Sequence, residues 1–176
     1  TVSDVADGDT QSPAHLIIDP GDDGVISLRE AIIAANNRAG DDTISFTVGG
    51  TIFLTAGLPS LTDDGTTIDG GGTIVIDGSA LGGSLVGLQL TSADNVLRGL
   101  TIVNFPGSGV EVLGATATGN VIADNFIGTN GTTAMGNGGH GVLIRNGASD
   151  NVVGGAEHGQ RRIADRRGYD GEPGHR

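Results

Sequence analysis

The chain has 176 residues and a formal charge of −12, because its 9 basic residues, all arginine, face 21 acidic ones. This length suits one domain with a core of its own, and the acidic balance disfavours nucleic acid and anionic membranes as partners. No apolar run approaches the roughly 20 residues that a membrane span needs, and the lack of cysteine excludes disulfide and thiol chemistry.

The N-terminal part combines a polar stretch with the one convincing helix. Residues 1–24 are polar and acidic, which predicts a loop with an edge strand at 16–18. Ser27 and Glu30 then form the pattern of a capping box, which predicts a helix over about 27–38. We expect its apolar face to cover one end of the domain, and that face holds Leu28, Ala31, Ile32 and Ala35.

Short strands follow the helix, separated by turns rich in glycine and aspartate. Ile44, Phe46 and Val48 alternate with polar residues, which predicts a strand over 43–48 with one apolar face. The same reasoning predicts further strands at 51–54, 66–69 and 73–77.

Three short phrases recur in the second half of the chain. The first, Gly-apolar-x-apolar, returns at intervals of 22 and 32 residues and begins at Gly87, Gly109 and Gly141. The second, Asn followed by apolar residues, returns at intervals of 25 and 31 residues and begins at Asn95, Asn120 and Asn151. The third occupies 100–105 and 124–128. Three strand phrases in each repeat predict an all-β parallel β-helix with three faces.

The recurring asparagines predict side-chain hydrogen bonds at the corners, and the spacing of the phrases predicts an inserted loop. Asn95, Asn120 and Asn151 stand at equivalent corners, where their side chains can bond to neighbouring backbone and to each other. The longer last repeat predicts a polar loop at 129–138 that projects from a corner of the coil. We expect one domain over 1–160, with the helix as its N-terminal cap.

The segment 161–176 departs from the repeat pattern. Five of the nine arginines lie in it, and the apolar alternation stops. Residues 1–160 therefore carry four arginines against eighteen acidic residues, a net charge of −14. We interpret the tail as a truncation, a reading-frame change or a disordered end; the rival interpretation is a basic binding tail. Arginines without interleaved aromatics are a weak nucleic-acid signal, so we expect no nucleic-acid partner.

Several stretches resemble a known family. The run SLREAIIAANN is followed by GDDTISF and LPSLTDDGTTIDGGG, and later by NVLRGLTIVNF and GNVIADNFIGT. Over about residues 24–159 the chain is similar to right-handed parallel β-helix proteins with a CSLREA-type N-terminal motif. The leading cysteine of that motif is Ile26 here, which excludes any role for a thiol at this position.

The resemblance implies a cellular location for the chain but no particular catalysed reaction. Members of this family are mostly bacterial secreted or cell-surface proteins, often segments of larger chains, and the resemblance brings no established catalytic residues. It implies an extracellular or cell-surface location for this chain. We therefore expect a non-catalytic β-solenoid with a scaffold, adhesion or glycan-binding role, whose partner is a carbohydrate or a surface protein.

An enzyme is the alternative, because parallel β-helices also host polysaccharide lyases and glycoside hydrolases. A lyase needs acidic groups and a base beside a uronate, and a hydrolase needs two carboxyl groups at a set separation. The candidate catalytic residues for either reaction are Asp94, Arg98, Glu111, Asp124 and Arg145. Nothing in their local sequence marks a catalytic group, and Asp94 stands in an Asp-Asn-Val turn where a carboxylate satisfies backbone donors.

Metal binding has one candidate segment. Asp19, Asp22 and Asp23 resemble a calcium loop loosely, with Glu30 at position 12. Position 3 is Gly21, however, and Glu30 belongs to the capping box, so the pattern departs from an EF-hand. The four histidines are not at zinc-ligand spacing. We predict no cofactor, with calcium at this loop as the alternative.

Overall fold

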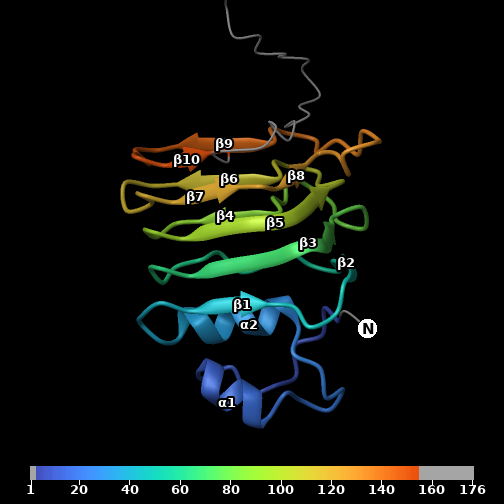
Figure 1. Ribbon diagram of the computed structural model, residues 1–176, viewed down its shortest axis with the longest axis vertical. Helices are drawn as coiled ribbons and strands as arrows, with labels where there is room; N and C mark the ends of the chain where they lie inside the picture. Colours follow the sequence, from blue (N-terminus) through green and yellow to red (C-terminus); the bar gives the residue numbers. More distant parts are fainter. Residues whose placement is uncertain (1–2, 155–176) are drawn as a thin grey trace, which may run out of the picture.

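The computed structural model describes residues 3–154 as a stack of β-coils that rests on two short helices (Figure 1). Helices α1 (Pro13–Ile18) and α2 (Leu28–Asn36) lie at the N-terminal end of the stack. The strands are β1 (Thr43–Ser45), β2 (Gly50–Phe53), β3 (Thr67–Asp77), β4 (Leu88–Leu90), β5 (Val96–Val103), β6 (Val110–Leu113), β7 (Val121–Ala123), β8 (Phe126–Ile127), β9 (Val142–Arg145) and β10 (Val152–Val153). Within this part of the chain, no helix is long and apolar enough to cross a membrane.

The strands form three faces, and all ladder pairings between them are parallel. The first face has the order β1-β3-β5-β7-β10, and the third has the order β4-β6-β9. The second face contains β2, the later half of β3, the later half of β5, and β8. Strands β3 and β5 are long because each turns the corner from the first face to the second. The prediction of a three-faced parallel β-helix is confirmed.

Columns of inward-pointing aliphatic side chains form the core. On the first face, the register places Ile44, Ile68, Leu97, Ile122 and Val153 above one another. The three middle members are buried, whereas Ile44 is half-buried and Val153 is exposed. Each coil thus buries its apolar side chains only against the coils on either side of it, and the end coils are less well covered.

Helix α2 closes the N-terminal end of the stack. Ser27 and Glu30 make the capping box, and Leu28 and Ile32 join the core cluster. Ala34 is buried as well, whereas Ala31, expected on the apolar face, is half-buried. The helix therefore acts as a lid on the first coil.

Glu30 also ties the N-terminal segment to this lid. Its carboxylate accepts hydrogen bonds from the backbone N–H groups of Asp7, Gly8 and Ser27, at 2.8, 2.6 and 2.8 Å. Burial raises the pKa of Glu30, but these hydrogen bonds outweigh burial and hold the pKa below its ordinary value. Glu30 is consequently ionised and structural.

Three expected elements differ from the structure. The expected strand at 16–18 is part of helix α1, because Ser12 caps the segment and Pro13 occupies its first turn. The first strand ends at Ser45 rather than at residue 48, since the chain bends there to reach β2. The separate strands at 66–69 and 73–77 are one bent strand, β3, whose register shifts between Asp69 and Ile74.

A buried asparagine ladder crosses the coils beside the first face. The Oδ1 atom of Asn95 accepts from the N–H of Thr66 at 3.0 Å, and Oδ1 of Asn120 accepts from the N–H of Asn95 at 2.9 Å. Oδ1 of Asn151 in turn accepts from the N–H of Asn120 at 2.9 Å. The Nδ2 groups of Asn95 and Asn120 also donate to the next Oδ1 in the ladder. Backbone donors at a corner, which no strand pairs, are satisfied in this way.

Two further asparagines, which the sequence analysis did not predict, also accept hydrogen bonds from backbone N–H groups of a neighbouring coil. Oδ1 of Asn125 accepts from the N–H of Leu100, and Oδ1 of Asn137 accepts from the N–H of Phe105, both at 2.9 Å. Asn125 follows an aspartate just as Asn95 and Asn151 do, so the repeated Asp-Asn pair was an available signal. Asn137 anchors the end of the 129–138 loop to the stack.

The asparagine ladder makes a first prediction. Asn120→Ala should lower the free energy of unfolding by about 3 kcal/mol, because two buried donors of Asn95 lose their acceptor. Urea unfolding followed by circular dichroism measures the loss. The half-buried Asn151 is the matched control, and Asn151→Ala should cost less; an equal or larger loss there would contradict this account.

The start of the ladder makes a second prediction. Thr66 is buried, and its hydroxyl oxygen has no hydrogen-bond partner among residues 3–154. Thr66→Val keeps the shape and removes an unsatisfied polar group, so it should raise the free energy of unfolding by about 1 kcal/mol. A destabilised variant in the same urea experiment would show that the hydroxyl is satisfied in solution.

Candidate functional site

The third face presents a row of outward side chains in register. Along β4 and β6, Leu88, Leu90, Val110 and Val112 point inward and are buried. The residues between them point outward, and the register aligns Gln89 with Glu111 and Glu111 with Leu143. Residues far apart in the chain therefore lie side by side on the surface of successive coils.

Hydrogen bonds join four polar side chains along this row, which we call the third-face row: Ser60, Gln89, Glu111 and Arg145. The hydroxyl of Ser60 donates to Oε1 of Gln89 at 2.6 Å, and Nε2 of Gln89 donates to Oε2 of Glu111 at 2.6 Å. Nε of Arg145 donates to Oε1 of Glu111 at 2.7 Å. The order of the bonds fixes the amide of Gln89 and the guanidinium of Arg145 in one orientation each.

Burial differs sharply along the third-face row. Glu111 is only 4% exposed, although it points outward, whereas the side chain of Arg145 is 48% exposed. Among the side-chain nitrogens of Arg145, only Nε donates a hydrogen bond within residues 3–154, so the two terminal amino groups can donate to a ligand. Glu111 is an anchor in this arrangement, and Arg145 with the half-buried Gln89 forms the accessible part.

The electrostatics of Glu111 agree with an anchoring role. Burial by itself raises the pKa of Glu111, but hydrogen bonds from Arg145 and Gln89 and the charge of Arg145 outweigh it. The pKa of Glu111 is therefore held below its ordinary value. A carboxyl group with a lowered pKa stays ionised at neutral pH and is a poor general acid.

The other candidate carboxylates lie elsewhere on the coil. Asp94 and Asp124 have left-handed backbone angles, with φ of 57° and 55°, and each directly precedes a buried asparagine. Asp94 stands at the corner before the first face, and Asp124 at the corner between the first and second faces. Both are exposed turn residues, on other sides of the coil from Glu111.

Arg98 lies on the first face and has a structural partner. Its Nη2 lies 2.8 Å from Oδ2 of Asp69, and Oδ1 of Asp69 accepts from the N–H of Gly71. Asp69 is the aligned residue on the neighbouring coil, so this ion pair crosses from β3 to β5. Among the five catalytic candidates, the structure brings only Glu111 and Arg145 into contact.

The candidate calcium loop has other contacts. The carboxylate of Asp23 accepts from the hydroxyl of Ser3 at 2.9 Å and from the N–H of Val25 at 2.8 Å. Among residues 3–154, no group of three or more histidine, aspartate and glutamate side chains is placed to hold a metal ion.

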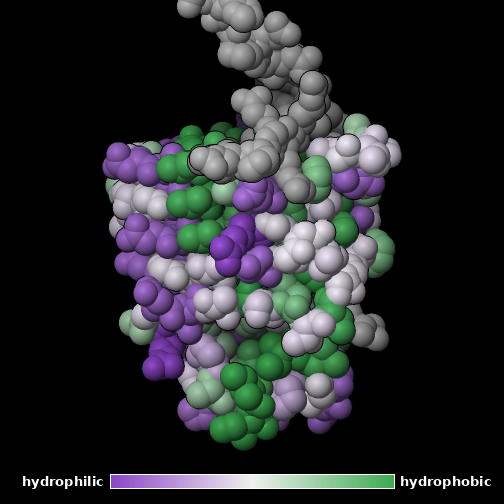
Figure 2. Space-filling model, in the orientation of Figure 1, coloured by the Kyte–Doolittle hydropathy of each residue, from purple (hydrophilic) through white to green (hydrophobic). Residues whose placement is uncertain are grey.

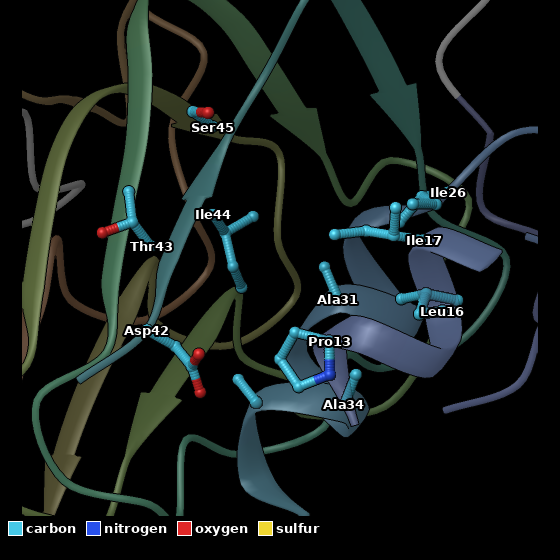
Figure 3. Close-up of a pocket in the computed structure, with 11 residues that line it drawn as sticks. Pro13, Leu16, Ile17, Ile26, Ala31, Ala34, Asp42, Thr43, Ile44 and Ser45 are labelled. Carbon is cyan, nitrogen blue, oxygen red and sulfur yellow. The ribbon is translucent and has the colours of Figure 1, made fainter. Parts of the chain in front are cut away.

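A second candidate site is a groove of about 220 Å³ between the helices and β1, which we call the β1 groove (Figure 3). Helix α1 contributes Pro13, Leu16 and Ile17, and the β1 segment contributes Asp42 to Ser45. Ile26, Ala31, Ala34 and Ala35 complete the lining. Sequence reasoning missed this groove because it expected a strand where α1 lies.

No protein-family model, curated protein sequence or solved structure matches the chain. Function therefore has to follow from the geometry of residues 3–154. The third-face row is a hydrogen-bonded polar arrangement along one face of the coils. The β1 groove is a mainly apolar site at the N-terminal end of the stack.

The third-face row makes a third prediction, on pH. A lowered pKa in the folded state stabilises the protein above the ordinary pKa of the group, and this contribution is lost as pH falls through the folded pKa. Arg145→Ala should raise the pKa of Glu111, because burial then acts with only Gln89 opposing it. The variant should be less stable than the parent at about pH 7, and the difference should shrink towards about pH 4.

Urea unfolding at several pH values and an NMR titration of the Glu111 carboxyl carbon measure these effects. Arg98→Ala is the matched control, because the Arg98–Asp69 pair is well exposed and should contribute little. An unchanged Glu111 titration in Arg145→Ala would show that the guanidinium does not set this pKa.

Proposed function

We propose that this chain is a non-catalytic β-solenoid that binds a glycan on its third face. The observation that carries the proposal is the hydrogen-bonded third-face row, in which Glu111 is buried and Arg145 is accessible. Side chains held in place before binding lose little conformational entropy when a ligand arrives. The row is therefore suited to recognition.

The chemistry of the accessible groups suits a polyhydroxylated ligand. The guanidinium of Arg145 keeps its two terminal amino groups for two adjacent ligand oxygens, and the amide of Gln89 keeps one N–H beyond its bonds to Ser60 and Glu111. Neighbouring coils are spaced by ~4.8 Å, a distance comparable with the length of one sugar unit. Gln89 on β4 and Arg145 on β9 lie two coils apart, so they can contact two separate units of one extended glycan.

The positions of the charged groups favour binding over catalysis. A hydrolase requires two carboxyl groups that face one bond, and a lyase requires a base beside a bound uronate. Glu111 lies on the third face and is held ionised by Arg145, while Asp94 and Asp124 occupy corner turns.

The resemblance to CSLREA-motif proteins gives the proposal its setting. The resemblance covers about residues 24–159, and its most specific part, Ser27 to Ala31, forms the capping box and first turn of helix α2. We propose an extracellular or cell-surface location, in which the solenoid is one segment of a larger chain. The polar loop at 129–138 adds a second exposed surface for a surface-protein partner.

A fourth prediction tests glycan binding. The purified chain should bind a subset of immobilised neutral and acidic polysaccharides, and Gln89→Ala and Arg145→Lys should each weaken binding about fivefold. Arg145→Lys keeps the charge beside Glu111 while removing the planar fork, so it tests recognition with the anchor charge retained. Arg98→Ala, on the first face, should bind like the parent.

The same samples decide between binding and catalysis. Incubation with each polysaccharide, with and without Ca²⁺, should release neither unsaturated products nor reducing ends. Turnover that disappears in Glu111→Gln would overturn the non-catalytic proposal, and absence of glycan binding would overturn the proposed ligand class.

A further inference from the structure

The first face ends at an unpaired strand edge. β1 pairs with β3 and with no other strand of the described chain, and the N–H of Thr67 on β3 donates to the carbonyl of Asp42. Peptide groups alternate sides along a strand, so those of Asp42 and Ile44 face β3. Those of Thr43 and Ser45 face the other way, into the space between β1 and the helices.

The β1 groove lies at the N-terminal end of the core column on the first face, where one further inward side chain would fit. Ile44 is the last residue of the column that continues through Ile68 and Leu97, and it points into the groove (Figure 3). The opposite wall consists of Leu16, Ile17 and small side chains of α2. An additional strand beside β1 would place one aliphatic side chain in this space, in line with Ile44.

Exposed apolar side chains surround the β1 groove. Ile17 and Ile26 line it and are 73% and 42% exposed, and Ile18 beside them is 81% exposed. Hydrophobic residues gather at this end of the molecule, over α1, in the space-filling view (Figure 2). Contiguous exposed apolar surface of this kind marks interaction sites.

The charge at the β1 groove is negative. Asp42 lines the groove, and burial raises its pKa; Arg38 opposes this effect, and Asp63 and Asp41 add to it. A cation from a ligand would relieve the repulsion among these carboxylates. Two copies of a chain with a charge of −12 repel each other, so the charge favours a basic partner over a second copy.

We propose that the β1 groove binds an extended segment of a basic partner protein as an additional strand on β1. The backbone of the segment bonds to the peptide groups of Thr43 and Ser45. One aliphatic side chain of the segment packs under Ile44 against α1, and a neighbouring lysine or arginine lies beside Asp42. Strand addition of this type takes affinity from main-chain bonds and specificity from alternate side chains. The proposal is independent of the glycan proposal, because the β1 groove contains none of the side chains of the third-face row.

The fifth prediction uses a synthetic probe, the fluorescein-labelled peptide Lys-Thr-Ile-Thr-Val-Thr-Lys. Its fluorescence anisotropy should rise and saturate with added protein. In NMR hydrogen exchange, saturation should slow the amides of Thr43 and Ser45 and leave that of Ile44 nearly unchanged. The same peptide with proline in place of isoleucine should not bind.

Matched variants distinguish binding in the β1 groove from nonspecific hydrophobic binding. Ile17→Asp should weaken binding at least about tenfold, whereas Ile18→Asp, an equally exposed isoleucine on α1 outside the groove, should not. Ser45→Pro removes an N–H that faces away from β3 and places a ring at the free edge, so it should also block binding. Asp42→Asn should weaken binding of the basic peptide and not of its version with glutamine for lysine.

Three outcomes would overturn the proposal. One is the absence of saturable binding by folded parent protein. Another is equal weakening by Ile17→Asp and Ile18→Asp, which would place the peptide elsewhere. The third is concentration-dependent self-association, seen by sedimentation, that the peptide reverses and Ile17→Asp abolishes, because the occupant would then be a second copy.

Discussion

The structure depends on the contact between one coil and the next. A single coil cannot enclose its own apolar side chains, so Ile68, Leu97 and Ile122 are buried only because the register stacks them. The strands bond between coils along each face, but the corners between faces expose backbone donors that no strand can pair. Asn95 and Asn120 supply acceptors for these donors, and they fix the register of one coil on the next.

The same register that builds the core also arranges the surface. Inward and outward positions alternate along each strand, so a ladder of buried leucines on the third face implies a ladder of outward residues between them. Gln89, Glu111 and Arg145 lie 22 and 34 residues apart along the chain, yet their side chains bond in a row.

The N-terminal end of the stack differs from its middle, because the first coil has a neighbouring coil on one side only. Helix α2 covers part of this end by laying Leu28 and Ile32 on the first coil. The helix does not cover the edge of β1, where the β1 groove remains. The sites therefore divide by chemistry: polar recognition along a face, and apolar recognition at an unpaired edge.

The sequence by itself determined the coil, the three strand phrases and the capping helix. These features are encoded in local spacing: Asn95 and Asn120 repeat in step, and Ser27 and Glu30 form a capping box within one turn. The tertiary structure decided what depends on contacts between coils. In the folded chain, residues 13–18 form a helix. Asp94 and Asp124 lie away from Glu111, and Glu111 bonds to Arg145. Side-chain contacts between coils depend on the strand register and on the length of each inserted loop. Neither can be predicted from the sequence of a single repeat phrase.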